Sequence, residues 1–251
     1  MLFIAFTLAA PLASFGAIAV GERRPSWERP AKSAVLGLVA GALGVTRDDT
    51  QAHRALDREY LYAVRVEDFE ARAPRRPMTD YHTAQTAASQ RGHRFATRRE
   101  ELSAERIETI LTRREYLTDC CFTILLWTGA AAPRFSLDSI AGALRQPTFT
   151  PYLGRKSCPL MLPMTPRLID AAEPLDAFRL YDAGENEVSA RFRTNARLHA
   201  KPVYVGLDAA ARMSSNQGRL EKRRDAVVHR GRWQFGLREE AVVAWPGGAD
   251  E

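Results

Sequence analysis

The chain has 251 residues, of which 45% are hydrophobic and 26% are charged, and its formal net charge is +6. This composition is typical of a globular protein and argues against a disordered chain, a collagen or a coiled coil. Of the 36 basic residues, 32 are arginines. The excess is compatible with codon preference, but it also suits a phosphate-binding protein, because a guanidinium group can bind two phosphate oxygens at once.

The N-terminal region predicts a buried strand followed by a buried helix. Leu2–Leu8 is short and apolar, as strands are, and Lys32–Leu43 is apolar on nearly all sides, which predicts a helix packed on a sheet and ending at Gly44. Met1–Gly21 carries no charged side chain and has the length of a membrane span or a secretion signal. No basic residue precedes it, however, and Pro11 interrupts it. We therefore expect a strand in a cytoplasmic protein without a membrane segment.

The middle of the chain predicts a helix, two or three strands and an insertion. Thr50–Arg58 is typical of a short helix, and Tyr60–Val66 alternates as a strand does. Residues 70–104 have few apolar anchors and several arginines, so we expect a protruding loop or hairpin there. Ile107–Leu117 and Cys120–Thr128 predict either a strand pair or one bent strand.

The order of the elements predicts an α+β fold. Ser136 is placed to cap a helix that runs to about Arg145, and the turn-rich loop Pro151–Pro163 leads to a further strand. The resulting βαββαβ order is that of the ferredoxin-like or RNA-recognition-motif plan, which we assign to residues 1–165. Residues 166–251 are expected to form a basic, mainly β extension packed on this palm. Its strand-like pieces are Glu187–Phe192, Pro202–Leu207 and Ala241–Trp245.

Positive charge is concentrated in two segments. Residues 71–114 carry a net charge of +5 and residues 191–238 carry +9, whereas each of the three remaining segments is net acidic. Such uneven basicity is typical of a protein that binds a polyanion, although codon preference alone would also enrich the surface in arginine.

Known catalytic and metal-binding patterns fit the chain poorly. GxSxG, HExxH, GxGxxG and Walker A patterns do not occur in the sequence. Asp48 and Asp49 suit the start of a helix better than a metal site. Three cysteines, Cys120, Cys121 and Cys158, give an odd number without a CxxC pair, which favours buried thiols over a disulfide framework or a zinc site. We expect neither a cofactor nor a metal.

Three segments have the residues of a binding site. In Tyr152–Leu160, a glycine would let the backbone approach a phosphate beside Arg155, Lys156 and Ser157, although an exposed basic turn would have the same sequence. In a strand spanning Thr112–Leu117, Arg113 and Glu115 would share one face and Arg114 and Tyr116 the other. One arginine would then pair with Glu115 and the other would be available to a phosphate.

The third segment is Asp80–Thr83, inside the basic insertion. Here Tyr81 and His82 are suited to stacking on bases or, in a nuclease, to acid–base chemistry on a ribose 2′-hydroxyl. A histidine in a loop often has neither role.

Together these segments resemble one family, CasD, the type I-E CRISPR-associated Cascade subunits that hold the 5′ end of the guide RNA. The most specific match is Pro151–Leu160, with the sequence PYLGRKSCPL. Weaker matches follow the same order along the chain, and residues 165–230 match poorly. These weaker matches are Ala10–Gly16, Arg24-Pro25, Pro30–Ser33, Leu36–Leu38, Arg47–Thr50, Asp80–Thr83, Arg114–Leu117 with Asp119, and Arg232–Phe235 with Arg238-Glu239.

The resemblance implies a ferredoxin-like palm whose insertion, here about residues 71–104, forms a β-hairpin thumb. It implies that the palm holds the 5′ handle of the CRISPR RNA, while the thumb separates handle from spacer and reaches the adjoining backbone subunit. The implied partners are the CRISPR RNA, the backbone and large subunits of Cascade and, indirectly, target DNA. The implied RNA contacts are Lys32, Ser33, Arg47, Tyr81, His82, Arg113, Arg114, Gly154, Arg155, Lys156 and Ser157.

The leading hypothesis is therefore a non-catalytic RNA-binding subunit that caps the Cascade backbone filament in antiviral defence. The alternative is a metal-independent endoribonuclease that processes CRISPR repeat RNA, with Tyr81, His82 and Lys156 supplying a base, an acid and a charge stabiliser. A separate RNA-recognition-motif protein is a third hypothesis, but the paired aromatic strands of that family are missing. The role of Arg212–Arg238 is open: the segment could contact RNA, target DNA or the large subunit, or be disordered until assembly.

Overall fold

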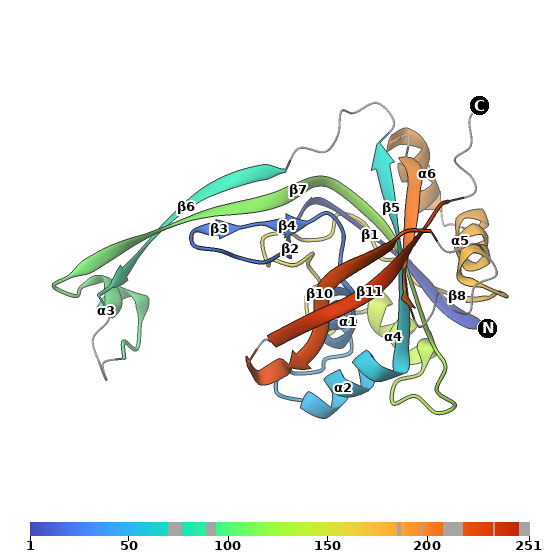
Figure 1. The fold of residues 1–251 in the computed structure, drawn as a ribbon, viewed down its shortest axis with the longest axis horizontal. Coiled ribbons are helices and arrows are strands. Elements are labelled where there is room, and N and C mark those ends of the chain that lie inside the picture. The colour runs from blue at the N-terminus through green and yellow to red at the C-terminus, as the bar shows by residue number, and fades with distance from the viewer. Residues whose placement is uncertain are drawn as a thin grey trace.

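The computed structural model describes residues 1–69, 77–88, 94–184, 187–196, 198–207, 218–232 and 234–245 (Figure 1). The strands are β1 (Leu2–Ala13), β2 (Phe15–Gly16), β3 (Arg23–Arg24), β4 (Ser26–Trp27), β5 (Tyr60–Phe69), β6 (Met78–Ala87), β7 (Ile107–Thr128), β8 (Arg167–Asp170), β9 (Leu198–Gly206), β10 (Leu220–His229) and β11 (Gln234–Val243). The helices are α1 (Lys32–Ala42), α2 (Thr50–Glu59), α3 (Arg98–Leu102), α4 (Leu137–Arg145), α5 (Pro174–Ala183) and α6 (Glu187–Ala196), and a 3₁₀ turn spans Arg230–Arg232.

The apolar N-terminal segment forms an interior strand of the main sheet, whose order is β10-β11-β9-β5-β7-β1-β8. β1 pairs antiparallel with β7 on one side and with β8 on the other. Every residue from Phe3 to Ala10 is buried, because both faces of the sheet are covered there. The strand is longer than predicted and continues through Pro11 to Ala13. In the part of the chain that the structure describes, no helix is long and apolar enough to cross a membrane.

The two segments predicted around residues 107–128 form a single strand. β7 runs from the far end of the β6–β7 hairpin into the centre of the sheet, where it pairs with β1 and β5 (Figure 1). Asp119, at the junction of the two predicted pieces, has a φ of 51°. Aspartate tolerates this left-handed conformation better than most residues. The prediction of one bent strand is therefore the correct one of the two.

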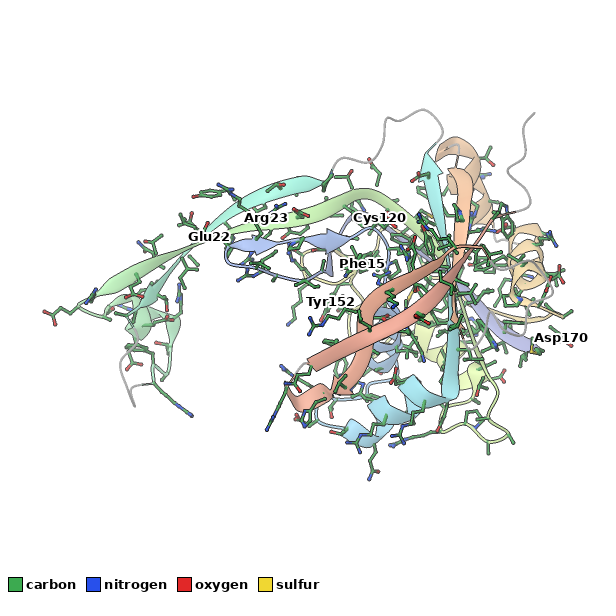
Figure 2. The ribbon with its side chains drawn as sticks, viewed as in Figure 1. Phe15, Glu22, Arg23, Cys120, Tyr152 and Asp170 are labelled. Carbon is green, nitrogen blue, oxygen red and sulfur yellow. The ribbon has the colours of Figure 1, made fainter. Side chains whose placement is uncertain are left out.

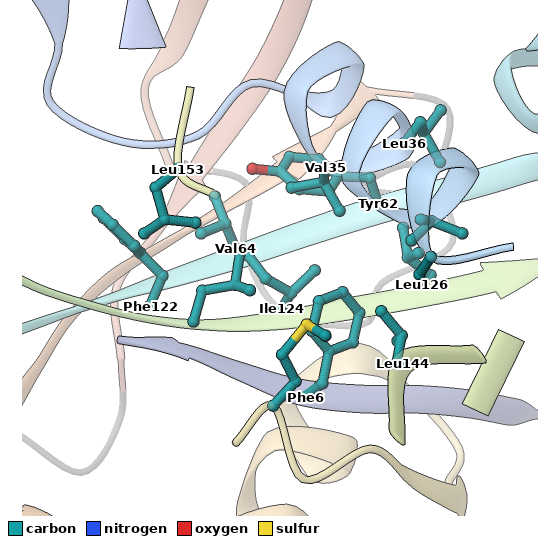
Figure 3. Close-up of a cluster of buried hydrophobic side chains, with 14 of the residues drawn as sticks. Phe6, Val35, Leu36, Tyr62, Val64, Phe122, Ile124, Leu126, Leu144 and Leu153 are labelled. Atoms are coloured by element: carbon teal, nitrogen blue, oxygen red, sulfur yellow. The ribbon is translucent and has the colours of Figure 1, made fainter. Parts of the chain in front are cut away.

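Alternate residues of the central strands enter two hydrophobic cores, as the period of a strand requires. On one face, Phe6 and its neighbours pack against α1, α2 and α4, and Figure 3 shows this cluster around Val35, Ile124 and Leu144. On the other face, Phe3 packs with Phe178 of α5. Cys120, Cys121 and Cys158 are buried thiols, which confirms the prediction for the adjacent pair.

Local helix signals were read correctly. α1 and α2 occupy the predicted segments, and Gly44 follows α1 with a φ of 75°, which favours glycine. The Asp49 carboxylate caps α2 by accepting a hydrogen bond from the Ala52 backbone N–H at 2.9 Å, which confirms the helix-start interpretation for this residue. The Ser136 hydroxyl accepts from the Ser139 N–H at 3.1 Å and caps α4 as predicted.

The C-terminal region was read less well. The prediction of a strand at Glu187–Phe192 is wrong, because this segment lies in α6. The alternation of this short segment is outweighed by tertiary contacts: one residue beyond it, Arg193 lies 3.2 Å from the buried Glu67 carboxylate. Pro202–Leu207 is a strand as far as Gly206, and β11 covers Ala241–Val243. Of the basic stretch 212–238, residues 212–217 and 233 lie outside the described residues, and the rest forms most of the β10–β11 hairpin.

Within the predicted insertion, β6 pairs antiparallel with the first half of β7, from Met78 opposite Tyr116 to Ala87 opposite Ile107. This hairpin extends away from the main sheet, with α3 near its far end (Figure 1). Residues 70–76 and 89–93, which belong to the same predicted insertion, lie outside the described residues.

Candidate nucleic-acid interface

The loop Pro151–Leu160 is a tight turn held against the end of β1. The Ser14 N–H donates to the Leu153 carbonyl at 3.1 Å, and the Leu153 N–H donates to the Cys158 carbonyl at 2.8 Å. Gly154 has a φ of 84°, and a Cβ at this position would lie 1.8 Å from the Ser14 carbonyl oxygen. Only glycine therefore permits this approach, which leaves Lys156 and Ser157 exposed on the outside of the turn.

Arg155 connects this loop to the base of the β6–β7 hairpin. Its guanidinium carbon lies 4.5 Å from the centre of the Tyr116 ring. Its two terminal nitrogens lie 3.4 Å from the carbonyl oxygens of Glu115 and Arg24. The side chain is half-buried, so part of its charge remains open to a ligand. Arg155 thus holds the loop against the hairpin, while the exposed part of its side chain can bind a phosphate.

Cross-strand pairing collects further arginines at the hairpin base. β3 pairs parallel with β7, so that Arg23 lies beside Arg113 and Arg24 beside Arg114, and on the other side of β7 Tyr81 lies opposite Arg113. Since paired residues share a face, Tyr81, Arg113 and Arg23 form one row across the ribbon. Figure 2 labels Arg23 on this arm, and labels Phe15 and Tyr152 closer to the body. We define the hairpin base as Arg23, Arg24, Arg113, Arg114, Arg155 and Lys156.

The predicted partner of Glu115 is wrong. Its carboxylate pairs with Arg23 at 3.0 Å, rather than with Arg113 or Arg114, because β3 brings Arg23 alongside β7. Arg114 donates from Nε to the Thr112 hydroxyl at 3.1 Å. Neither Arg113 nor Lys156 forms a side-chain hydrogen bond or an ion pair with the part of the chain that the structure describes. Both exposed cations are therefore available to an anionic ligand.

Tyr81 and His82 do not converge on one point. They are consecutive residues of β6, so their side chains leave opposite faces of the ribbon. Tyr81 is 58% exposed, as a stacking residue must be. The His82 Nδ1 lies 4.0 Å from the Asp80 carboxylate, on the face that also carries Arg114. A base and an acid acting on the same ribose would have to approach it from one side.

The other predicted contacts lie around α1 and α2. The Lys32 backbone N–H donates to the Asp225 carboxylate at 3.0 Å, and its ammonium group donates to the Asp57 carbonyl at 2.6 Å, so this lysine already has protein partners. Ser33 lines a cleft of about 240 Å³ between α1, α2 and the β10–β11 hairpin. Arg47 is exposed just before α2. The eleven predicted residues thus fall into two groups, one at the hairpin base and loop and one around this cleft.

Sequence reasoning missed several basic residues in both groups. Arg23 and Arg24 join the hairpin base only through the parallel pairing of β3. His53, Arg224 and Arg230 line the cleft with Ser33. The high charge of residues 191–238 indicated that this segment binds a polyanion. It did not indicate which of its arginines would lie together on one surface.

Comparisons with known sequences relate this chain to CRISPR-associated proteins. The family model described as "CRISPR-associated protein (Cas_Cas5)" matches residues 3–239. The protein "CRISPR system Cascade subunit CasD" of Escherichia coli (strain K12) is 33% identical over 183 residues, which cover 72% of this chain and 77% of that protein.

Two solved structures share the fold. One, titled "CRISPR RNA-guided surveillance complex", has a TM-score of 0.59 and 23% identity and covers 96% of this chain and 89% of the other. Another, titled "Crystal structure of Cas protein", has a TM-score of 0.54 and 21% identity, with coverage of 96% and 95%. The match of the family model over nearly the whole chain and the identity to CasD show that the chain belongs to the Cas5 family of CRISPR-associated proteins, as a CasD-type member.

Proposed function

We propose that this chain is a non-catalytic RNA-binding subunit of a type I-E Cascade complex, which holds the 5′ handle of the CRISPR RNA and caps the backbone filament in antiviral defence. The observation that carries the proposal is the hairpin base, where six cations from three separate segments surround an outward glycine turn. Clustered cations with a close backbone approach are what phosphate recognition requires. The Escherichia coli relative is named as a Cascade subunit, which supports the same assignment.

The architecture fits a ferredoxin-like palm with a thumb. Strands β5, β7, β1 and β8 are neighbours in that order and pair antiparallel, and α1 and α4 pack on one face. We assign the palm to residues 1–165, the thumb to the β6–β7 hairpin and the C-terminal extension to residues 166–251. A central β1 also favours the cytoplasmic assignment, because removal of a signal segment ending near Ala19 would take this strand out of the sheet.

RNA would contact the hairpin base in two different ways. Arg113 and Lys156 would bind phosphate oxygens, while the exposed ring of Tyr81 would stack on an unpaired base. The outer part of the thumb would reach the adjoining backbone subunit. The large subunit and, through it, target DNA would complete the surroundings of the handle.

The double variant Arg113→Ala/Lys156→Ala should bind single-stranded CRISPR repeat RNA about 10- to 100-fold more weakly than the unmodified chain, because each cation supplies a charge-assisted contact. The slope of log K against log salt should fall by about 0.7 for each contact that is lost. Filter binding over a salt series measures both quantities. Arg179→Ala, on the opposite face of the molecule, is the matched control. Unchanged affinity and slope in the double variant would mean that the loop and ribbon are only structural.

The alternative role in RNA processing has its own test. Because Tyr81 and His82 leave opposite faces of β6, we expect the purified protein to leave repeat RNA intact during incubation in EDTA. Gel analysis of end-labelled RNA checks this. A cleavage product that appears with the unmodified protein and disappears with His82→Ala would establish the endoribonuclease instead.

A further inference from the structure

A second basic surface lies under the β10–β11 hairpin, apart from the hairpin base. It is the cleft of about 240 Å³ in which Ser33 lies. Its walls combine aromatic rings with titratable side chains from four parts of the chain. They include Trp27, His53, Arg223, Arg224, Arg230 and Phe235.

The two carboxylates of the cleft are already paired with cations. The Asp225 carboxylate accepts from Arg238 at 2.8 and 2.9 Å and from the Lys32 backbone N–H at 3.0 Å. The Asp57 carboxylate lies 3.9 Å from the Lys32 ammonium group. Neither Arg238 nor Lys32 is among the residues that line this cleft. Because both carboxylates have these partners, neither forms an ion pair with Arg223 or Arg224, although Asp225 still attracts the charge of Arg223.

Arg223 is unusually placed for a charged residue. It is 2% exposed, its guanidinium carbon lies 5.3 Å from the Trp27 ring centre, and it donates to the backbone carbonyls of Arg29 and Pro30. Its Nε is buried without a hydrogen-bond partner. Neither it nor Arg224, which donates from Nε to the Phe235 carbonyl at 2.9 Å, forms an ion pair with a carboxylate of the described ranges. Burial and the charge of Arg29 outweigh the attraction of Asp225 and Glu240 and lower the pKa of Arg223, so a further anion would stabilise this buried cation.

The rim of the cleft adds further positive potential. The Arg230 Nη2 lies 2.9 Å from the His53 Nε2. Burial and the charge of Arg230 lower the pKa of His53, and burial and the charge of Arg47 lower the pKa of Arg230. Arg230 and Arg47 therefore repel each other at the rim, beside a histidine whose neutral form is favoured, and a phosphate group would reduce this repulsion.

The cleft is connected to the glycine loop through neighbouring residues of the chain. Phe15, which lines it, follows Ser14, whose backbone N–H donates to Leu153 of the loop. Trp27 pairs with Phe15 through β2 and β4. An RNA strand that leaves Gly154 and Lys156 would therefore reach the cleft across the β2–β4 turn. An acidic peptide would satisfy the arginines but would make no specific use of the Trp27 and Phe235 rings.

We propose that this cleft is a nucleotide subsite for single-stranded RNA, in which Arg224 and Arg230 bind a phosphate and Trp27 and Phe235 contact the base. The proposal rests on the RNA-binding function proposed above, and it gives part of the basic C-terminal stretch a role. Ser33 would then contribute to the same subsite, as the resemblance implied, while the backbone N–H of Lys32 helps to hold the Asp225 wall in place. The β10–β11 hairpin would then form one wall of the cleft that holds the RNA.

The test compares RNA affinity among variants of the full chain. Arg224→Ala/Arg230→Ala should bind single-stranded repeat RNA about tenfold more weakly, with a salt slope smaller by about 1.4 for two contacts. Arg219→Ala, a 77% exposed residue just before β10, should bind as the unmodified chain does. RNA substituted with 4-thiouridine should crosslink to the segment 218–238, and the double variant should lose this crosslink. Arg223 is left unchanged because its burial makes a folding defect the expected effect.

Three outcomes separate this subsite from the function on which it rests. If Arg113→Ala/Lys156→Ala loses RNA affinity while Arg224→Ala/Arg230→Ala keeps full affinity, the subsite is wrong and the proposed function stands. If neither double variant changes RNA affinity, the proposed function fails as well. If Arg224→Ala/Arg230→Ala weakens binding of the assembled complex to duplex DNA and leaves RNA binding intact, the cleft serves DNA and the subsite is overturned. A thermal melt of each variant confirms that it is folded.

Discussion

Replacing Gly154 with alanine is expected to displace the loop Pro151–Leu160 from β1 and to remove most RNA binding. The left-handed backbone at this position, with a φ of 84°, costs an alanine about 1–2 kcal/mol. The added Cβ would also lie 1.8 Å from the Ser14 carbonyl oxygen, so the loop or the end of β1 has to move. Such a movement separates Arg155 and Lys156 from the hairpin base. Filter binding should show at least a tenfold loss of affinity, with a lower melting temperature.

Gly142→Ala is the matched control for this variant. Gly142 lies inside α4, and a Cβ there meets no atom within 4 Å. Alanine is the better helix former, so this change should raise the free energy of unfolding by up to about 1 kcal/mol without affecting RNA binding. Full RNA affinity and unchanged stability in Gly154→Ala would show that the close approach of the loop to Ser14 is dispensable. The conclusion that this position requires glycine would then be wrong.

The elements that the sequence predicted well are those whose signals are local. A capping serine at position 136, an aspartate before Thr50 and a glycine after α1 each act within one turn of their own helix, so they can be read without knowledge of the fold. The buried strand at Leu2 is similar, because its apolar run records burial on both faces of a sheet. Its extension past Pro11 depends on the partner β7, and was not predicted.

The β10–β11 hairpin could not be predicted because tertiary contacts override its pattern. Register shifts between Arg224 and Ala226 and between Val227 and His229 break the alternation that identifies a strand. Its inward residues include Arg223 and Asp225, and charged residues are rarely buried. The residues of the cleft come from positions as distant as 15, 53 and 224. For this reason the charge of the segment was visible in the sequence, while the site it helps to build was not.

Glu67→Gln is expected to lower the free energy of unfolding by about 3 kcal/mol, because it removes a buried carboxylate that pairs with both Arg65 and Arg193. Glu67 is 1% exposed, and its carboxylate accepts from Arg65 at 2.7 Å and from the Thr123 hydroxyl at 2.8 Å. Arg193 of α6 lies 3.2 Å away, and Arg65 also binds Asp182 of α5. Glu67 and Arg65 together thus join α6 and α5 to the main sheet. Urea unfolding at neutral pH measures the loss.

The surface pair of Lys222 and Glu239 provides the control, since both side chains are well exposed and 3.8 Å apart. Glu239→Gln should change the free energy of unfolding by less than about 1 kcal/mol. A similarly small effect of Glu67→Gln would contradict the prediction, and would mean that a neutral amide can replace the carboxylate between Arg65 and Arg193.

Acid sensitivity gives the same network a second, independent measurement. Burial raises the pKa of the Glu67 carboxyl, but Arg65 and Arg193 outweigh burial and hold the pKa below its ordinary value of 4.5. As the pH falls, the unfolded chain therefore takes up this proton first, so the stabilisation is complete above about pH 4.5 and is lost as the pH falls through the lower, folded pKa. The unmodified chain should lose stability over this range more steeply than Glu67→Gln, which has no proton to gain. If the free energy of unfolding falls equally with pH in the two proteins, the acid sensitivity comes from other groups. The ionisation of Glu67 would then not contribute to stability.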